Sequence, residues 1–348
     1  MILKLRSCCS YRCERFVSVL KCVNLVGLLD PLEVKRLTLR NRIVMPPMQT
    51  GRATFTGAVT NRLIGFYVRR SAALGLVIVE HCYVSKSGKL GLKQLGIYDD
   101  ALISGLERLA ANVHALATPV VVQISHAGGV ALKDVIGEQP AGPSAVRGTR
   151  ELKGNEIERL VEEFAAATER AVKAGFDGVE LHGAHGFLLN QFFSPLLNKR
   201  RDKYGGSLEN RMRFPIKVVK KVRKSLGGRL LLYRVGADDL CARGTQVKDA
   251  VDFSKKLEQA GVDIVDVSGG FCGSEPRQLR NVKGYFVPQA FEVKKAVGIP
   301  VIGVGGISEA DYADGLVRDG KVDLVAVGRA LWKEPKWAEK AVETLRAK

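Results

Sequence analysis

Residues 230–268 read LLLYRVGADDLCARGTQVKDAVDFSKKLEQAGVDIVDVS. An apolar run at 230–235 is followed by a segment, 246–260, in which apolar residues recur at helical spacing, and then by a second apolar run at 264–268. Two short apolar strands joined by one helix are typical of a β/α unit in a parallel sheet. Gly261 follows the helical segment, where helices favour a left-handed residue as their stop.

The same alternation continues over the chain from about residue 40. Eight strands are predicted, at Arg42–Met48, Leu76–His81, Val120–Ser125, Gly178–His182, Leu230–Val235, Ile264–Ser268, Val301–Val304 and Leu324–Gly328. Eight helices are predicted, at Arg62–Leu74, Ala101–Ala117, Glu156–Ala174, Glu209–Leu226, Gln246–Ala260, Gln289–Val297, Glu309–Asp319 and a last segment ending near Arg346. Because composition does not change between the units, the pattern predicts an α/β protein with one closed (β/α)8 TIM barrel.

Two features flank the first predicted strand. Leu32-Glu-Val and Leu37-Thr-Leu surround a tight turn, which predicts an N-terminal β-hairpin that closes the barrel floor. A doubly wound sheet is the alternative fold, and it normally carries a G-x-G-x-x-G turn after its first strand. The chain has Met45-Pro-Pro-Met48 there, so the barrel is favoured.

Bulk properties limit the partners. The 348 residues carry a formal net charge of +18, which brings nucleic acid, anionic membranes and anionic small molecules into consideration. Much of the excess lies on predicted helix faces, where solvated lysines are the simpler interpretation, although Lys199, Arg200, Arg201 and Lys203 form a denser loop cluster. We therefore expect no nucleic-acid partner and, because no stretch is long and apolar enough to cross a bilayer, no membrane partner.

Seven cysteines occur without a C-x-x-C pair, so the spacing indicates neither a zinc site nor an iron–sulfur cluster. A reducing, cytoplasmic location fits best. Residues 1–27 are basic and then apolar, but Lys21 and Asn24 interrupt the apolar run and no typical signal-peptidase site follows. We expect residues 1–27 to be an extension outside the fold, disordered or introduced by a start codon placed too early, and residues 28–348 to form the barrel.

Function in such barrels lies at the carboxyl ends of the strands. Strand seven leads into Gly303-Val-Gly305-Gly-Ile307, and strand eight ends in Val327-Gly328-Arg329. Glycines there let backbone N–H groups approach a ligand, so the two loops predict a phosphate site to which Arg329 adds a charged contact. Glycines needed only for tight turns are the alternative.

Polar side chains end three other strands. Gln123 and Arg234 close strands three and five, where an amide and a guanidinium can bind the pyrimidine edge of a flavin. Each alone is better explained as a structural polar group, but together with the phosphate site they favour a flavin. His182 and His185 follow strand four and can donate to one carbonyl oxygen, polarising it for hydride addition. A metal site would need a third ligand, which is not evident nearby.

Four segments resemble signature sequences of the Old Yellow Enzyme family of NAD(P)H:flavin oxidoreductases, in the family's order and from about Leu28 to Trp337. They are residues 41–48 (NRIVMPPM), 123–128 (QISHAG), 178–186 (GVELHGAHG) and 198–211 (NKRRDKYGGSLENR). The resemblance implies bound FMN, reduction by NADH or NADPH, and hydride transfer to a small electrophilic acceptor such as an activated alkene, an enone or a quinone. A homo-oligomer is left open.

The resemblance also implies roles for individual residues. It assigns the FMN ring to Pro46, Pro47, Met48, Gln49, Gln123 and Arg234, the FMN phosphate to Gly305, Gly328 and Arg329, and the acceptor's electron-withdrawing group to His182 and His185. His81 matches a position near the flavin that usually holds a small residue. Gln49 replaces a threonine or cysteine that tunes the flavin potential. Phe187 replaces a tyrosine that donates the proton completing alkene reduction, and phenylalanine has no proton to give.

The sequence is also compatible with two other functions. The missing tyrosine is compatible with a flavin-carrying electron-transfer subunit whose partner performs the chemistry. The positive charge is compatible with an FMN barrel that acts on RNA, although the catalytic cysteine motif and the added helical domain of such enzymes are not found. Cysteines 82, 241 and 272 follow strands two, five and six and are more simply explained by packing than by redox chemistry.

Overall fold

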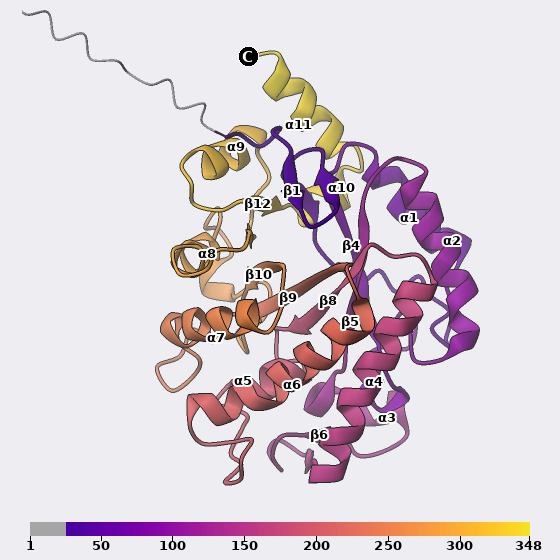
Figure 1. Ribbon diagram of the computed structural model, residues 1–348, viewed down its shortest axis with the longest axis vertical. Helices are drawn as coiled ribbons and strands as arrows, with labels where there is room; N and C mark the ends of the chain where they lie inside the picture. The colour runs from indigo at the N-terminus through magenta and orange to yellow at the C-terminus, as the bar shows by residue number, and fades with distance from the viewer. Residues whose placement is uncertain (1–25) are drawn as a thin grey trace, which may run out of the picture.

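The computed structural model describes residues 26–348, and nearly all of the expected 1–27 extension lies outside them. Eight parallel strands close into a barrel in the order β10-β11-β12-β3-β4-β5-β8-β9 (Figure 1). Their bounds are β3 Ile43–Met45, β4 Leu76–Tyr83, β5 Val120–Ser125, β8 Gly178–Gly183, β9 Leu230–Gly236, β10 Ile264–Ser268, β11 Val301–Gly303 and β12 Leu324–Ala326. Each corresponds to one predicted strand, so the predicted TIM barrel is confirmed.

Helices follow the strands and surround the barrel (Figure 1). The main ones are α1 Asn61–Ser71, α2 Ile103–His114, α4 Gly154–Lys173, α6 Leu208–Leu226, α7 Val247–Gln259, α8 Val287–Lys294, α9 Ala310–Arg318 and α11 Trp337–Arg346. In α4 the buried residues Ile157, Leu160, Val161 and Phe164 recur at the spacing that places them on one face. Ser207 caps α6, as its side chain accepts a hydrogen bond from the Asn210 amide.

The predicted hairpin is present as β1 Leu32–Val34 and β2 Leu37–Leu39, paired antiparallel. Val34 and Leu39 pack into the cluster that fills the barrel interior. That cluster is formed by inward-facing residues of the strands, Val44, Leu76, Ile78, Val121, Leu230, Leu232, Ile264, Ile302, Leu324 and Ala326. The hairpin therefore closes the amino-terminal end of the barrel, which leaves the carboxyl ends of the strands as the open face.

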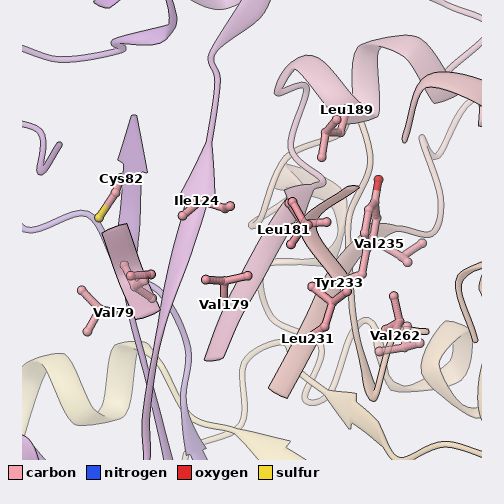
Figure 2. Packing of buried hydrophobic residues seen from close by; sticks show 14 of the residues in the cluster. Val79, Cys82, Ile124, Val179, Leu181, Leu189, Leu231, Tyr233, Val235 and Val262 are labelled. Atoms are coloured by element: carbon pink, nitrogen blue, oxygen red, sulfur yellow. The ribbon is translucent and has the colours of Figure 1, made fainter. Parts of the chain in front are cut away.

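The opposite faces of the strands pack against the helices. Figure 2 shows part of this outer layer, to which β5 contributes Ile124, β8 contributes Leu181 and β9 contributes Tyr233. Inward and outward residues alternate along each strand because successive side chains in a strand point to opposite faces. A polar side chain that points inward near the carboxyl end of a strand therefore lies at the open end of the barrel.

Strand β4 departs from this alternation. Val79 lies opposite Val122 of β5 and Cys82 lies opposite Ile124, so three steps along β4 match two along β5. One extra residue of this kind is a β-bulge, and it reverses the facing of the strand residues beyond it. Cys82 consequently joins Val79 in the outer layer (Figure 2). His81 instead lines the cavity at the barrel mouth.

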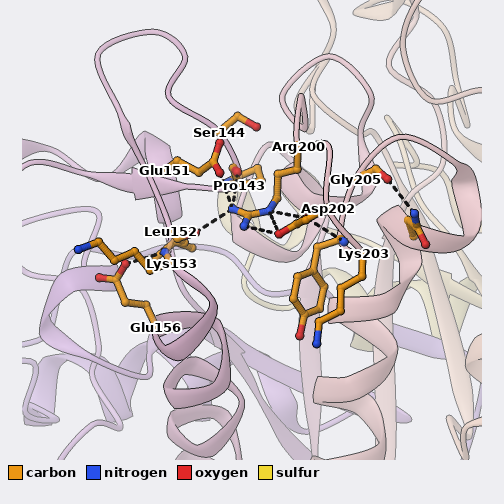
Figure 3. Close-up of polar contacts among 12 residues, drawn as sticks. Pro143, Ser144, Glu151, Leu152, Lys153, Glu156, Arg200, Asp202, Lys203 and Gly205 are labelled. Atoms are coloured by element: carbon orange, nitrogen blue, oxygen red, sulfur yellow. Dashed lines mark hydrogen bonds and ion pairs between the residues drawn. The ribbon is translucent and has the colours of Figure 1, made fainter.

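Arg200 is the buried member of the basic loop cluster singled out in the sequence, and its role is structural. The Arg200 side chain is only 6% exposed, and its guanidinium donates to the carbonyl oxygens of Pro143 at 2.9 Å and Leu152 at 2.8 Å (Figure 3). It also pairs with Asp202 at 2.7 Å. Arg200 thereby connects the loop after α5 (Leu188–Phe193) to the segment between β5 and α4. A side chain committed to these contacts is not available to nucleic acid.

Sequence periodicity did not reveal the short elements at the barrel mouth. They include α3 Lys133–Ile136, the paired β6 Ala141–Gly142 and β7 Arg150–Glu151, α5 and α10 Arg329–Lys333, together with the 3-10 turns η1 Lys86–Gly88, η2 Asp100–Leu102, η3 Gly128–Val130 and η4 Arg277–Leu279. Within residues 26–348, no helix has the length and apolar character needed to cross a membrane.

Candidate active site

The open face of the barrel contains one large cavity of about 650 Å³. All twelve predicted site residues line it, namely Pro46, Pro47, Met48, Gln49, His81, Gln123, His182, His185, Arg234, Gly305, Gly328 and Arg329. They come from seven of the eight strand ends, which brings together positions up to 283 residues apart in the chain. Strand ends that are far apart in the sequence thus line one composite cavity.

Loops after β11 and β12 form one end of the cavity. Gly305 has φ +120°, and a Cβ atom built there would lie 2.7 Å from the Tyr285 ring, so only glycine fits. Gly328 faces the loop after β3, where a Cβ atom would lie 3.3 Å from Pro46 and 3.5 Å from the sulfur of Met48. Backbone at both glycines is therefore accessible to a group in the cavity.

Positive charge gathers at this end. Arg280, Lys283, Arg329 and Lys333 all line the cavity. Arg329 forms an ion pair with Glu275, and its Nη2 donates to the Tyr285 hydroxyl at 3.4 Å. Four cationic side chains beside glycine backbone that lines the cavity suit a phosphate group. Glu275 and Tyr285 belong to the β10–α8 connection and were not anticipated.

A polar layer forms the floor of the cavity, directly above the apolar interior. Gln123 donates to Glu180 at 2.7 Å, and Arg234 forms an ion pair with Asp266 at 3.2 Å. Each of the four side chains is 5% exposed or less. Burial and the neighbouring Asp266 raise the pKa of Glu180 well above its usual range, and burial also raises the pKa of Asp266. The Arg234 cation acts in the opposite direction and lowers the pKa of both carboxyl groups.

The histidine pair lies above this floor. The rings of His182 and His185 are 5.1 Å apart between centroids, and Nε2 of His185 lies 2.8 Å from the Ser268 hydroxyl. The buried Nδ1 of His182 has no hydrogen-bond partner within residues 26–348. Burial is the largest cause that lowers the pKa of both rings well below its usual range, and the neighbouring histidines and Arg234 lower it further. Both imidazoles are therefore neutral near pH 7.

A third imidazole completes this wall. The ring of His81 lies 6.0 Å from that of His182 and 5.0 Å from that of Phe187. Its Nδ1 contacts Nε2 of Gln94 at 2.8 Å. Gln94 is fully buried and lies in the loop after β4, thirteen residues beyond His81. Nothing in the sequence indicated that this loop turns back onto the strand from which it starts.

The cavity suits FMN on three observations. Glycine backbone and four cationic side chains at one end suit the phosphate. The Nε of Arg234 is buried without a hydrogen-bond partner in the described chain, although it lies near Asp266, and could serve an electron-rich ring edge. Pro46 and Met48 add apolar side chains to the lining beside Gly328. A planar ring with a phosphate tail matches this set of groups.

Comparison with known proteins identifies the family. The sequence profile of the NADH:flavin oxidoreductase / NADH oxidase family matches residues 27–348. The chain belongs to this family. It is 42% identical over 323 residues to an NADH oxidase of Thermoanaerobacter brockii, covering 89% of this chain and 50% of that protein. It is 39% identical over 329 residues to an NADPH dehydrogenase of Geobacillus thermodenitrificans, covering 92% and 95%.

A solved structure supports the same assignment. An Old Yellow Enzyme homologue from Zymomonas mobilis superimposes with a TM-score of 0.80 at 26% identity, covering 91% of this chain and 93% of that one. The predicted membership of the Old Yellow Enzyme family of NAD(P)H:flavin oxidoreductases is therefore confirmed. The chain spans half the length of the Thermoanaerobacter family member and nearly the whole length of the Geobacillus one.

Proposed function

We propose that this protein uses NAD(P)H to reduce bound FMN and passes the hydride to a small electrophilic acceptor, such as an activated alkene, an enone or a quinone. The observation that carries the proposal is the single cavity in which a phosphate-binding end, a polar floor and a wall of histidines meet. Bound FMN would supply a carrier that accepts hydride from nicotinamide and releases it to the acceptor.

Each part of the cavity has a proposed binding role. Gly305, Gly328 and Arg329 would hold the FMN phosphate through backbone N–H groups and a guanidinium. Gln123 and Arg234 would bind the pyrimidine edge, with the cation stabilising negative charge there. Residues 46–49 would line the ring. The Gln123–Glu180 and Arg234–Asp266 contacts support this arrangement because they orient both groups before any ligand binds.

His182 and His185 would bind the acceptor. Two neutral imidazoles can each donate one N–H to the same carbonyl oxygen, which withdraws electron density from the carbon that receives hydride. Donation from neutral rings also adds no further charge that would have to be desolvated beside the acceptor. The unpartnered Nδ1 of His182 and the contact of His185 with Ser268 are consistent with rings poised for a ligand.

Rapid mixing tests the proposal. We expect the purified protein to be yellow, and NADH or NADPH to bleach its flavin absorbance anaerobically. Mixing the reduced protein with 2-cyclohexen-1-one or 1,4-benzoquinone should restore the colour. A protein that takes up no FMN would refute the proposal. Reduction by NAD(P)H without reoxidation by any small acceptor would instead favour the electron-transfer subunit.

We also propose that the protein works in the cytoplasm with small molecules as its partners. The three cysteines among the described residues, Cys82, Cys241 and Cys272, are free thiols, in keeping with a reducing compartment. Fractionation of cells with an antibody to the protein would test the location.

A further inference from the structure

Phe187 stands in the cavity wall at the position that corresponds to the family's proton-donating tyrosine, so the wall has no hydroxyl there. Phe187 is buried, with its ring 4.2 Å from that of His182 and 5.0 Å from that of His81. Among the side chains in contact with the Phe187 ring, His81 and His182 carry N–H groups. His182 already has a proposed role with His185, which leaves His81 without an assigned task toward the acceptor.

Gln94 determines which nitrogen of His81 carries the proton. Its Oε1 accepts a hydrogen bond from the Leu90 amide at 2.6 Å, and a backbone amide can only donate. The other end of the same side chain must then be the NH2 group, which donates to Nδ1 of His81 at 2.8 Å and faces the His81 carbonyl at 3.2 Å. Nδ1 therefore accepts, and the imidazole proton lies on Nε2.

We propose that His81 is an acceptor-binding residue whose Nε2–H, fixed by Gln94, donates a hydrogen bond to a second oxygen of an acceptor already bound through its first oxygen by His182 and His185. The cavity thereby favours two-oxygen acceptors of the quinone class over enones with one carbonyl. This inference rests on the proposed function and adds to it a determinant of acceptor choice.

The chemistry of the two acceptor classes supports this choice. A quinone that receives one hydride, with its two electrons, needs one further proton to become a hydroquinone, and the final protonation is at oxygen, where water delivers protons rapidly. An enone must take its proton at carbon, which is slow without a positioned acid. A neutral imidazole N–H is a good hydrogen-bond donor and a very weak acid. A wall with His81 and Phe187 therefore suits the first class.

The charge state of His81 is consistent with a donor role. Burial is the main reason that the pKa of His81 is lowered to about 4, and the Arg234 cation lowers it further. Arg234 of β9 is the charged group that faces it, and the neutral rings of His182 in β8 and His185 in the loop after β8 lie on the same side of the cavity. His81 is thus a neutral donor at all pH values well above 4.

Acceptor selectivity tests the proposal. Single-turnover reoxidation of the NADH-reduced holoenzyme should be measured with 1,4-benzoquinone and with 2-cyclohexen-1-one. In His81→Ala we expect the quinone-to-enone rate ratio to fall about tenfold, which is the effect of one hydrogen bond of about 1.4 kcal/mol. His114→Ala, which removes a histidine paired with Asp177 at the other end of the barrel, should leave the ratio unchanged.

Binding gives a second readout that does not depend on turnover. The Kd of 4-hydroxybenzaldehyde, which has two oxygens, should rise in His81→Ala more than the Kd of phenol, both followed by flavin absorbance. An equal change for both ligands, or weaker FMN retention with both acceptors affected alike, would mean that His81 serves the flavin and would overturn the proposal. If the wild type is not reduced by NAD(P)H, the proposed function fails, whereas these Kd values still test His81.

Gln94→Glu tests the tautomer. A carboxylate at this place would accept from Nδ1–H, so the neutral ring would present a bare Nε2 to the acceptor. The same carboxylate would raise the pKa of His81, so the variant should gain quinone selectivity as pH falls and the ring becomes doubly protonated. The wild type should show no such ionisation between pH 6 and 9. A Gln94→Glu variant with the wild-type ratio at every pH would contradict the inference.

Discussion

Phe187→Tyr is the most informative substitution in this cavity. The ring is 7% exposed, lines the cavity and contacts His81 and His182, so an added hydroxyl would face the space proposed for the acceptor. A positioned general acid contributes about 10² to 10⁴ in rate, or about 3 to 5 kcal/mol of barrier. We therefore expect the rate of enone reduction by the reduced flavin to rise about 100-fold. This is the lower end of the range, because the neighbouring residues are not changed to orient the new phenol.

Stopped-flow spectroscopy measures this rate directly, since flavin reoxidation by 2-cyclohexen-1-one can be followed at saturating acceptor. The gain should disappear as pH approaches 10, where a tyrosine hydroxyl loses its proton. Reduction of the flavin by NADH should change little, because no proton is transferred to carbon in that half of the cycle. Phe55→Tyr, on an exposed loop position, is the matched control. A folded, fully FMN-loaded Phe187→Tyr protein with an unchanged enone rate would refute the reasoning.

Three further predictions concern the cofactor and stability. Arg234→Ala should weaken FMN binding at least tenfold in equilibrium dialysis, since it removes the cation at the polar floor; full flavin loading would count against the assignment. Gly305→Ala should reduce FMN retention while circular dichroism stays unchanged, because the Cβ atom would meet the Tyr285 ring at 2.7 Å; normal retention would show that this loop does not contact the phosphate. Burial lowers the pKa of His126 to about 3, so below pH 6.5 the unfolded chain takes up a proton that the folded one does not. His126 therefore contributes stability that is present above pH 6.5 and is lost towards pH 3 by about 1.4 kcal/mol per pH unit. His126→Gln should flatten the dependence of Tm on pH between pH 3 and 6.5. An equally steep dependence in the variant would exclude this histidine as its source.

The sequence allowed the barrel and the twelve cavity residues to be predicted for one reason. In a barrel of parallel strands, every carboxyl end lies at the same face, so strand assignment alone places Gln123, Arg234 and Gly305 together. Local strand patterns are strong here because most strand residues are buried on both sides. The roles of those residues rest on the resemblance and on the proposals above.

Other parts of the site could not be predicted. Glu180 and Asp266 lie within apolar strands. Their side chains point into the barrel and meet Gln123 and Arg234 only because the sheet closes, which the sequence of each strand does not show. Gln94 reaches His81 through a loop whose path depends on tertiary contacts. Arg280 and Lys283 of the β10–α8 connection also line the cavity. Their positions could not be predicted, because the path of a loop depends on its packing and its sequence has no repeating pattern.

The extra residue in β4 has a consequence for engineering and divergence. Without it, Glu80 would take the inward place of His81, and an acidic group would face the acceptor. Removing the His81 codon would thus leave Glu80 in the inward place and exchange a neutral donor for a carboxylate. The length of this strand therefore decides which of two neighbouring residues faces the cavity, and sequences of this barrel type can be compared for acceptor preference by that length.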